Sequence, residues 1–406
     1  MHVVGAGLAG LAAALALAKA GRRVTVLEAG PAAGGRCRSY FDRELGLRID
    51  NGNHLLLSGN HATFAYLDTI GARGTLFSPG RPLFPFVDVV NGERWTLRPS
   101  AGRLPWWIVL PSRRVPGTRA VDYLRLLRLA HQAGDASVAD TLKRDVLYHR
   151  LIEPLAVAAL NTPPRAGLAR LLGSVVRETL LQGGSACIPA FPRDGLSESL
   201  VDPAIDWLRT RGGDVAFARR VVSLDVTAER VTALRTIEGV VPVQAVVLAV
   251  PPWVATDLLP GTMAPTKFQA ILNIHFRIDA DPGPSGFAGI VNGTAQWAFV
   301  KAGHVSATIS AANHLVNESA DTLAAAVWPD MRMALRLPEP MPLVRVLKER
   351  RATFAATAAQ ERLRPGTRTR LGNLVLAGDW TATGLPATIE GAIRSGRTAA
   401  ETLLAA

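Results

Sequence analysis

The chain is poor in cysteine and in aromatic residues. Only Cys37 and Cys187 occur among its 406 residues, so neither a disulfide framework nor a thiolate metal cluster is expected. We expect Cys187 to be a small buried side chain. Aromatic residues make up 6% of the sequence and form no pattern with basic residues that is typical of a nucleic-acid recognition module. Nucleic acid is therefore not an expected partner.

Long apolar runs and a leader segment are also missing from the sequence. No apolar run reaches the length of about 18 residues that marks a membrane-spanning helix. The sequence opens inside an apolar run, without the charged and apolar regions of a signal peptide. We therefore expect a cytoplasmic protein that does not span a membrane.

Acidic residues are fewer than basic ones: 33 Asp and Glu stand against 45 Lys and Arg, a formal net charge of +12. Residues 104–130 combine this charge with Trp106 and Trp107, which are followed by Arg113 and Arg114. Tryptophan rings and arginines together suit the headgroup region of an anionic bilayer. This interpretation predicts peripheral association with the inner face of the cell membrane. An ordinary core helix with a solvated basic face explains the same residues equally well.

The N-terminal residues carry the most informative pattern. Val3-Val4 leads into Gly5-Ala6-Gly7-Leu8-Ala9-Gly10, an Ala/Leu-rich stretch follows, and Glu28 ends the next apolar run 21 residues beyond Gly7. Glycines between a strand and a helix allow a tight turn, close approach of a pyrophosphate and close helix packing. The helix N-terminus then faces the phosphates, and Glu28 accepts a hydrogen bond from a ribose. The pattern predicts a nucleotide site.

Two further motifs separate FAD from a nicotinamide cofactor. Gly34-Gly35-Arg36 follows where the pyrophosphate and ribitol of a flavin continue past the first helix, and an arginine suits that charge. Near the C-terminus an apolar run closes on Gly378-Asp379-Trp380, and a final helix opens at Ile389. These motifs resemble the opening and closing signatures of the amine oxidase and phytoene desaturase superfamily. A plain strand-turn-helix is the alternative interpretation of the closing motif.

The resemblance implies an α/β fold, with a Rossmann-like FAD-binding domain of the amine oxidase type and an inserted α+β substrate domain. We assign residues 1–60, 195–255 and 365–406 to the first domain, and residues 61–194 and 256–364 to the second. The first inserted segment is expected to be mainly helical.

The resemblance also implies noncovalent FAD, since no cysteine lies near Trp380. A second G-x-G-x-x-G motif is absent, which argues against a dedicated nicotinamide domain. Electrons then come from the substrate, from an external donor such as NAD(P)H that acts transiently, or from another carrier. The residues that the resemblance places at FAD are Gly5, Gly7, Leu8, Ala9, Gly10, Glu28, Ala29, Gly34, Gly35, Arg36, Gly52, Asn53, His54, Val221, Val222, Gly378, Asp379, Thr388, Ile389 and Ala392.

The middle of the chain resembles a narrower family. Residues 50–60 are similar to the segment in front of the flavin in phytoene and zeta-carotene desaturases. Residues 151–163 and 188–196 are similar to the bacterial hydroxysqualene dehydroxylases. This resemblance implies reductive removal of the hydroxyl group from hydroxysqualene, with hydride delivered from N5 of reduced flavin to an allylic cation.

Such a reaction requires an acid, dry surroundings and room for a long apolar isoprenoid substrate. His54 is our first candidate for the acid, because imidazole titrates near neutral pH. A hydrogen bond to backbone or flavin is its alternative role. Glu153 is the second candidate, with a salt-bridged place on a helix surface as the alternative. We expect Asp50 to hold the turn that presents Gly52.

Two other functions stay open at this point. One is an FAD-dependent desaturase of a carotenoid-type isoprenoid, or an amine oxidase. The other is a non-catalytic flavin or lipid carrier. The direction of electron flow separates the first from a dehydroxylase, because a dehydroxylase consumes reduced flavin whereas a desaturase or oxidase generates it.

Overall fold

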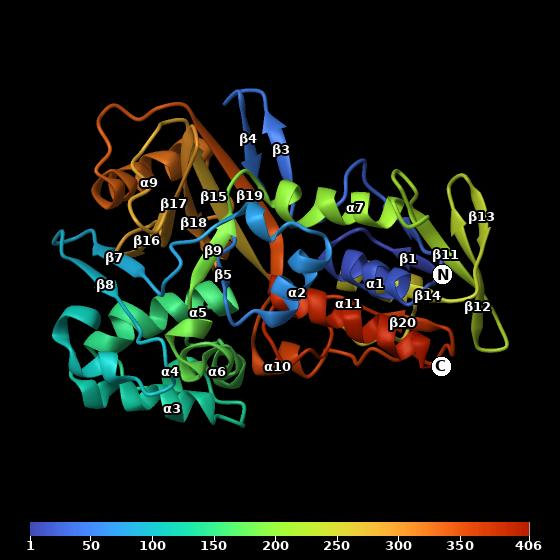
Figure 1. Ribbon diagram of the computed structural model, residues 1–406, viewed down its shortest axis with the longest axis horizontal. Coiled ribbons are helices and arrows are strands. Elements are labelled where there is room, and N and C mark those ends of the chain that lie inside the picture. Colours follow the sequence, from blue (N-terminus) through green and yellow to red (C-terminus); the bar gives the residue numbers. More distant parts are fainter. Residues whose placement is uncertain (406) are drawn as a thin grey trace.

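The computed structural model describes residues 1–405 and contains a parallel sheet and a larger mixed sheet (Figure 1). The parallel sheet has the strand order β10-β2-β1-β14-β20, and every neighbouring pair is parallel. Crossing connections of this kind build a doubly wound sheet. Its strands are β1 (His2–Val4), β2 (Thr25–Leu27), β10 (Asp214–Ala216), β14 (Val246–Leu248) and β20 (Leu374–Leu376).

Helices α1 (Leu8–Lys19) and α11 (Ile389–Leu404) lie side by side along the parallel sheet (Figure 1). A Cβ on Gly396 would lie 2.1 Å from the carbonyl oxygen of Ala9. The absence of a side chain therefore lets the first and last helices of the chain approach closely. The other helices near this sheet are α2 (His61–Thr69), α7 (Asp202–Arg209), α8 (Pro252–Leu258) and α10 (Ala358–Glu361).

The larger sheet has seven strands in the order β19-β15-β18-β17-β16-β7-β8. Helix α9 (Ala320–Leu335) packs on it, and Val327, Trp328 and Met331 are buried there together with Phe276. Its strands are β7 (Phe84–Asp88), β8 (Arg94–Leu97), β15 (Phe268–Phe276), β16 (Phe287–Val291), β17 (Trp297–Lys301), β18 (His304–Ile309) and β19 (Val344–Phe354).

Smaller elements complete the structure. An antiparallel sheet follows the order β11-β12-β13, β3 pairs with β4, and β9 pairs with both β5 and β6. A helical group lies below the larger sheet in Figure 1. These strands are β3 (Ser39–Asp42), β4 (Leu47–Asp50), β5 (Leu56–Leu57), β6 (Leu76–Phe77), β9 (Pro189–Pro192), β11 (Val221–Thr227), β12 (Arg230–Thr236) and β13 (Gly239–Pro242). The helical group comprises α3 (Arg125–Ala130), α4 (Val138–Thr141), α5 (Glu153–Leu160) and α6 (Ala169–Glu178).

The first inserted segment, residues 61–194, is mainly helical, as expected, but it also contains four short strands, β6 to β9. It contributes β7 and β8 to the edge of the larger sheet, where β7 runs parallel to β16. The sequence did not indicate these two strands, because they are short and β16, the partner of β7, lies some two hundred residues further along the chain. Long-range pairing of this kind leaves little local signal.

The two adjacent tryptophans point in different directions. Trp107 is buried and its ring packs edge to face on Tyr123, with 5.2 Å between ring centroids, whereas Trp106 is half exposed. The expectation of a paired interfacial motif was therefore wrong for Trp107. Within residues 1–405, no helix combines the length and the apolar character that crossing a membrane requires.

Candidate active site

The turn between β1 and α1 depends on two glycines. Gly5 has a φ of 101°, a conformation that side chains disfavour. A Cβ on Gly10 would lie 1.9 Å from the carbonyl oxygen of Gly5. A side chain at Gly10 would therefore push the helix away from the turn.

Gly7 stands at the N-terminus of α1 and faces open space. A Cβ built on Gly7 meets no atom within 4 Å, and no side chain caps this helix. The first N–H groups of a helix have no partner inside it, and the helix dipole adds positive potential there. Open space in front of free N–H groups fits the pyrophosphate of a dinucleotide.

The carboxylate of Glu28 lies under this turn. Its Oε2 accepts a hydrogen bond from the N–H of Ala6, and its Oε1 accepts one from the N–H of Gly30, each at 2.8 Å. Each carboxylate oxygen can accept a further bond. Glu28 therefore holds the loop and keeps capacity for a ribose hydroxyl.

The start of β11 lies beside Glu28. The N–H of Arg219 donates to the backbone carbonyl of Glu28 at 2.8 Å. Because Arg219 stands two residues before β11, this bond holds the start of the strand near Glu28. The first residues of β11 are Val221, which is buried, and Val222, which is exposed. These valines therefore lie near Glu28, the predicted ribose contact.

The Gly34-Gly35-Arg36 turn connects the two ends of the chain. The N–H of Gly34 donates to the carbonyl of Ala6 at 2.8 Å. The guanidinium of Arg36 donates from Nη2 to Asp379 Oδ1 at 2.7 Å. The arginine of the second motif and the aspartate of the closing motif therefore lie in direct contact, although 343 positions separate them.

Helix α11 is tied to the closing motif. Thr388 caps the helix, because its hydroxyl accepts a hydrogen bond from the N–H of Gly391 at 3.0 Å. The N–H of Gly378 donates to the Ser395 hydroxyl at 2.8 Å. The strand end, the Asp379 carboxylate and the N-terminus of α11 are thus held as one unit.

Asn53 is anchored on the larger sheet. Its Nδ2 donates to Thr308 Oγ1 at 2.9 Å, and its Oδ1 accepts from Ser306 Oγ at 3.0 Å. The side chain of Asn273 on β15 lies against Gly52, where a Cβ would be 3.2 Å from Asn273 Nδ2. Residues of β15 and β18 therefore position the turn that carries His54.

His54 is half-buried and, among the described residues, forms no hydrogen bond with protein. Burial lowers the pKa of His54 to about 4; Asp50 raises this pKa, whereas Arg36 and Lys301 lower it further. The expectation that this imidazole titrates near neutral pH was therefore wrong. The ring is mostly neutral at pH 7, because burial and two cations oppose a second positive charge.

Asp50 forms a buried ion pair with Lys301. Its Oδ1 also accepts hydrogen bonds from Ser39 Oγ at 2.6 Å and from the N–H of Leu196 at 2.8 Å. Burial raises the pKa of Asp50, but the ion pair with Lys301 outweighs it and holds that pKa below its usual value. The carboxylate is fully engaged and holds the start of the His54 turn in place.

Comparison with known proteins identifies this arrangement. The sequence matches the family described as flavin containing amine oxidoreductase over residues 8–278 and 300–404. The chain belongs to this family. FAD is therefore its cofactor, and the chain is an FAD-dependent oxidoreductase.

Individual relatives cover the whole chain. It is 48% identical to a protein named hydroxysqualene dehydroxylase from Rhodopseudomonas palustris, over 100% of this chain and 98% of that protein. It is 44% identical to a protein of the same name from Zymomonas mobilis, over 99% and 98% of the two chains. A solved structure of an oxidoreductase from Methanosarcina mazei has a TM-score of 0.76 at 16% identity and covers 98% of this chain and 99% of its own. That likeness shows the same fold.

Glu153 does not fit the role of acid in this flavin oxidoreductase. Its carboxylate is 41% exposed and lies 3.0 Å from His149 Nδ1, one helical turn earlier. A general acid for water loss requires a dry position, and this carboxylate stands in solvent. Glu153 therefore has the alternative role named above: it pairs with His149 on the surface of the helix.

Three residues of this flavin oxidoreductase site were missed from the sequence: Asn273, Lys301 and Glu390. Asn273 and Lys301 reach the His54 turn from β15 and β17. Glu390 accepts hydrogen bonds from the N–H groups of Ala62 and Thr63, and so caps α2 from α11. All three contacts span more than two hundred positions, so no local spacing marks them.

Proposed function

We propose that the protein removes the hydroxyl group of hydroxysqualene reductively and releases squalene. The identity of 48% and 44% to two proteins named hydroxysqualene dehydroxylase, over nearly the full length of each chain, carries this proposal. Identity of this extent includes the inserted segments as well as the nucleotide motifs. It therefore supports a shared substrate and not only a shared cofactor.

The overall reaction needs one proton and one hydride. The leaving hydroxyl takes the proton and departs as water, and the allylic carbon takes the hydride to form a C–H bond. Reduced FAD, when bound, supplies the hydride, and an external donor such as NAD(P)H would restore the reduced cofactor. The chain has to hold the alcohol in place, exclude water and deliver the proton.

An aromatic wall beside His54 suits the exclusion of water. Phe191, Phe287 and Phe299 form a buried cluster, and Leu55, the neighbour of His54, packs against it. The ring centroids of Phe191 and Phe299 are 5.6 Å apart in an edge-to-face arrangement. Aromatic faces stabilise a nearby cation.

His54 is the residue that we assign to the proton. Its ring has no hydrogen bond to any described residue, its chain neighbour Leu55 packs on the aromatic wall, and the polar residues of β15 and β18 position the turn that carries it. With a pKa of about 4, the protonated form is scarce at pH 7. That same low pKa makes it a strong acid toward the leaving oxygen.

Anaerobic mixing of the reduced protein with hydroxysqualene tests the proposal. We expect flavin absorbance to return as squalene forms, in a ratio of one to one, and no such return with squalene itself as the added compound. A desaturase or an amine oxidase would instead bleach oxidised flavin with its own substrate. If hydroxysqualene changes neither redox state, the proposal is wrong and a carrier role gains support.

A further inference from the structure

Residues 103–128 form an unusual surface. Seven of the eighteen exposed large hydrophobic side chains in the described part of the chain lie in this short segment. We call them the Trp106 patch. Its members are Leu104, Trp106, Val109, Leu110, Val121, Leu124 and Leu127. Concentration of exposed apolar side chains marks a surface that contacts something other than water.

The fold turns these side chains outward. Trp107 packs on Tyr123 and so joins the two short helical segments that carry the patch. Val121, Leu124 and Leu127 recur at intervals of three residues and are exposed, whereas Tyr123 and Leu126, on another side of the same segment, are buried. The patch is therefore a built feature, with its own core beneath it.

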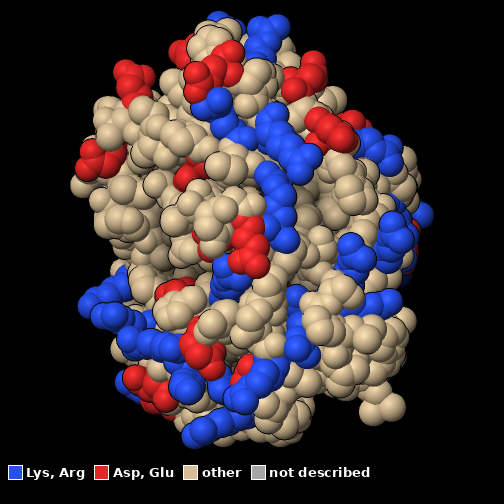
Figure 2. Space-filling view, turned by 90° about the vertical axis from the view of Figure 1, so that its left-hand side faces the viewer, with Lys and Arg blue, Asp and Glu red and all other residues tan. Residues whose placement is uncertain are grey.

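Arginines surround the patch. Between residues 98 and 131 the sequence has seven arginines and a single acidic residue, Asp122. The Asp122 carboxylate accepts a hydrogen bond from the backbone N–H of Arg119 at 2.7 Å and forms an ion pair with the guanidinium of Arg125 at 3.5 Å. The guanidinium of Arg113 lies 4.6 Å from the centre of the Trp106 ring. Figure 2 shows many Lys and Arg side chains over the lower part of the face that carries α3, with a smaller number of Asp and Glu side chains and uncharged surface among them.

We propose that the Trp106 patch docks the protein on an anionic bilayer. Exposed aliphatic side chains and one tryptophan suit the acyl and headgroup boundary, and the arginines match anionic headgroups. The inference rests on the proposed function in one respect: a long isoprenoid alcohol partitions into the bilayer, so a soluble enzyme gains by collecting it there.

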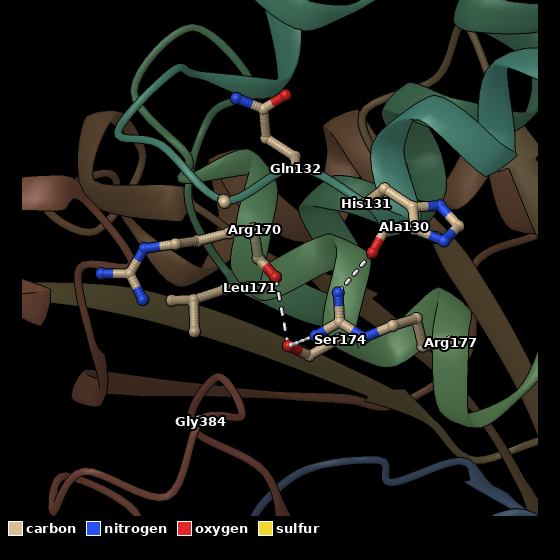
Figure 3. A pocket seen from close by; sticks show the side chains of 9 residues that line it. Ala130, His131, Gln132, Arg170, Leu171, Ser174, Arg177 and Gly384 are labelled. Atoms are coloured by element: carbon tan, nitrogen blue, oxygen red, sulfur yellow. Dashed lines mark hydrogen bonds between the residues drawn. The ribbon is translucent and has the colours of Figure 1, made fainter.

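A hollow lies next to the patch, at the end of α3. Helix α3 ends at Ala130, which lines a hollow of about 460 Å³ together with Leu171 of α6 and Gly384 of the loop before α11. Figure 3 shows Arg177 at its rim, where the guanidinium donates to the Ala130 carbonyl and to Ser174. His131, Gln132 and Arg170 line it as well, so it adds cationic and polar groups beside the patch.

Vesicle co-sedimentation tests the proposal on the FAD-loaded protein. We expect stronger binding to vesicles of phosphatidylcholine with phosphatidylglycerol than to phosphatidylcholine alone, and weaker binding at high salt. Trp106→Ser/Leu124→Ser should reduce binding about tenfold or more. Arg113→Gln/Arg128→Gln should reduce it about fivefold for each arginine on the anionic vesicles only. Ile237→Ser/Val240→Ser, which removes two exposed apolar side chains in the β12–β13 hairpin, is the matched control and should bind like the wild type.

Several outcomes would overturn the proposal. Equal binding of wild type and Trp106→Ser/Leu124→Ser is one, and equal loss in the control variant is another. A dimer in solution that the Trp106→Ser/Leu124→Ser change dissociates, with lipid binding unaltered, would assign the patch to a second copy of the chain. Turnover of detergent-dispersed substrate separates this proposal from the enzymatic one: the patch variant should keep it and lose turnover only with vesicle-embedded substrate.

Discussion

The FAD cradle and the His54 turn lie near each other in the fold but are built in different ways. The cradle uses glycines, backbone N–H groups and Glu28, and most of these lie within the first 36 residues. The His54 turn depends on Asn273, Ser306 and Thr308, which lie more than two hundred residues further along the chain. A cofactor shared by a superfamily is bound by a local motif, whereas the surroundings of the substrate are assembled by the whole fold.

The largest expected effect falls on the His54 turn. His54→Ala should retain its FAD spectrum and lose turnover by on the order of 10²–10⁴-fold, the usual contribution of a positioned acid. Because the pKa of His54 lies near 4, the protonated fraction grows about tenfold for each unit by which the pH falls from 7 to 5. Wild-type turnover should rise by the same factor. Single-turnover oxidation of the reduced protein by hydroxysqualene measures both effects.

His54→Gln is the matched control for the proton. Its amide donates a hydrogen bond but cannot release a proton as imidazolium does, so the pH dependence should disappear along with the rate. Retention of the pH dependence in His54→Gln would remove His54 from the acid role. Loss of FAD from His54→Ala would show that the ring supports the cofactor instead.

The FAD cradle should respond differently at its two inner glycines. Gly10→Ala places a Cβ 1.9 Å from the Gly5 carbonyl oxygen, so we expect a loss of about 3 kcal/mol in unfolding free energy, with or without FAD. Gly7→Ala places its Cβ in open space. The apo protein should therefore keep its stability and bind FAD at least about tenfold more weakly. Urea unfolding and FAD titration distinguish the two variants, and equal behaviour in both assays would contradict the assigned cradle.

The same difference explains what the sequence was able to predict. The strand, glycine turn and helix at residues 2–19 follow from the local pattern, as does the closing strand before Asp379. Cys187 is buried as expected, and burial raises the pKa of its thiol to about 12.

What the sequence missed depends on tertiary structure. The low pKa of His54 results from burial and from cations at Arg36 and Lys301, which only the fold brings to it. Trp106 and Trp107 are neighbours with the same side chain, yet only Trp107 packs on the ring of Tyr123. No periodicity distinguishes the two tryptophans, because the choice is made by a residue on another segment.

Glu28 offers a smaller effect within the cradle. Glu28→Ala removes the acceptor of two backbone N–H groups and the predicted ribose contact. We expect FAD binding to weaken by roughly 1–3 kcal/mol. Glu28→Gln keeps one side-chain oxygen and should lose less. Isothermal titration of the apo variants with FAD measures the difference, and unchanged affinity in Glu28→Ala would remove the ribose contact from the site.

The smallest effect is expected behind the His54 turn, at His275. This side chain is fully buried on β15, neither ring nitrogen has a hydrogen-bond partner in the described structure, and its ring centroid lies 5.6 Å from that of His304. Burial lowers the pKa of His275 to about 3, and His304 and Lys301 lower it further while Asp50 raises it. The unfolded chain therefore binds this proton first as the pH falls below about 6.5, and the folded state loses stability from there down to about pH 3.

His275→Leu removes the group, so at pH 7 the unfolding free energy of the variant should equal that of the wild type or exceed it by about 1 kcal/mol. At pH 5 the difference in unfolding free energy should be larger, because only in the wild type does folding then require a buried imidazole to lose its proton. Urea unfolding at both pH values measures the change, and parallel losses in the two proteins would show that His275 does not contribute to acid sensitivity.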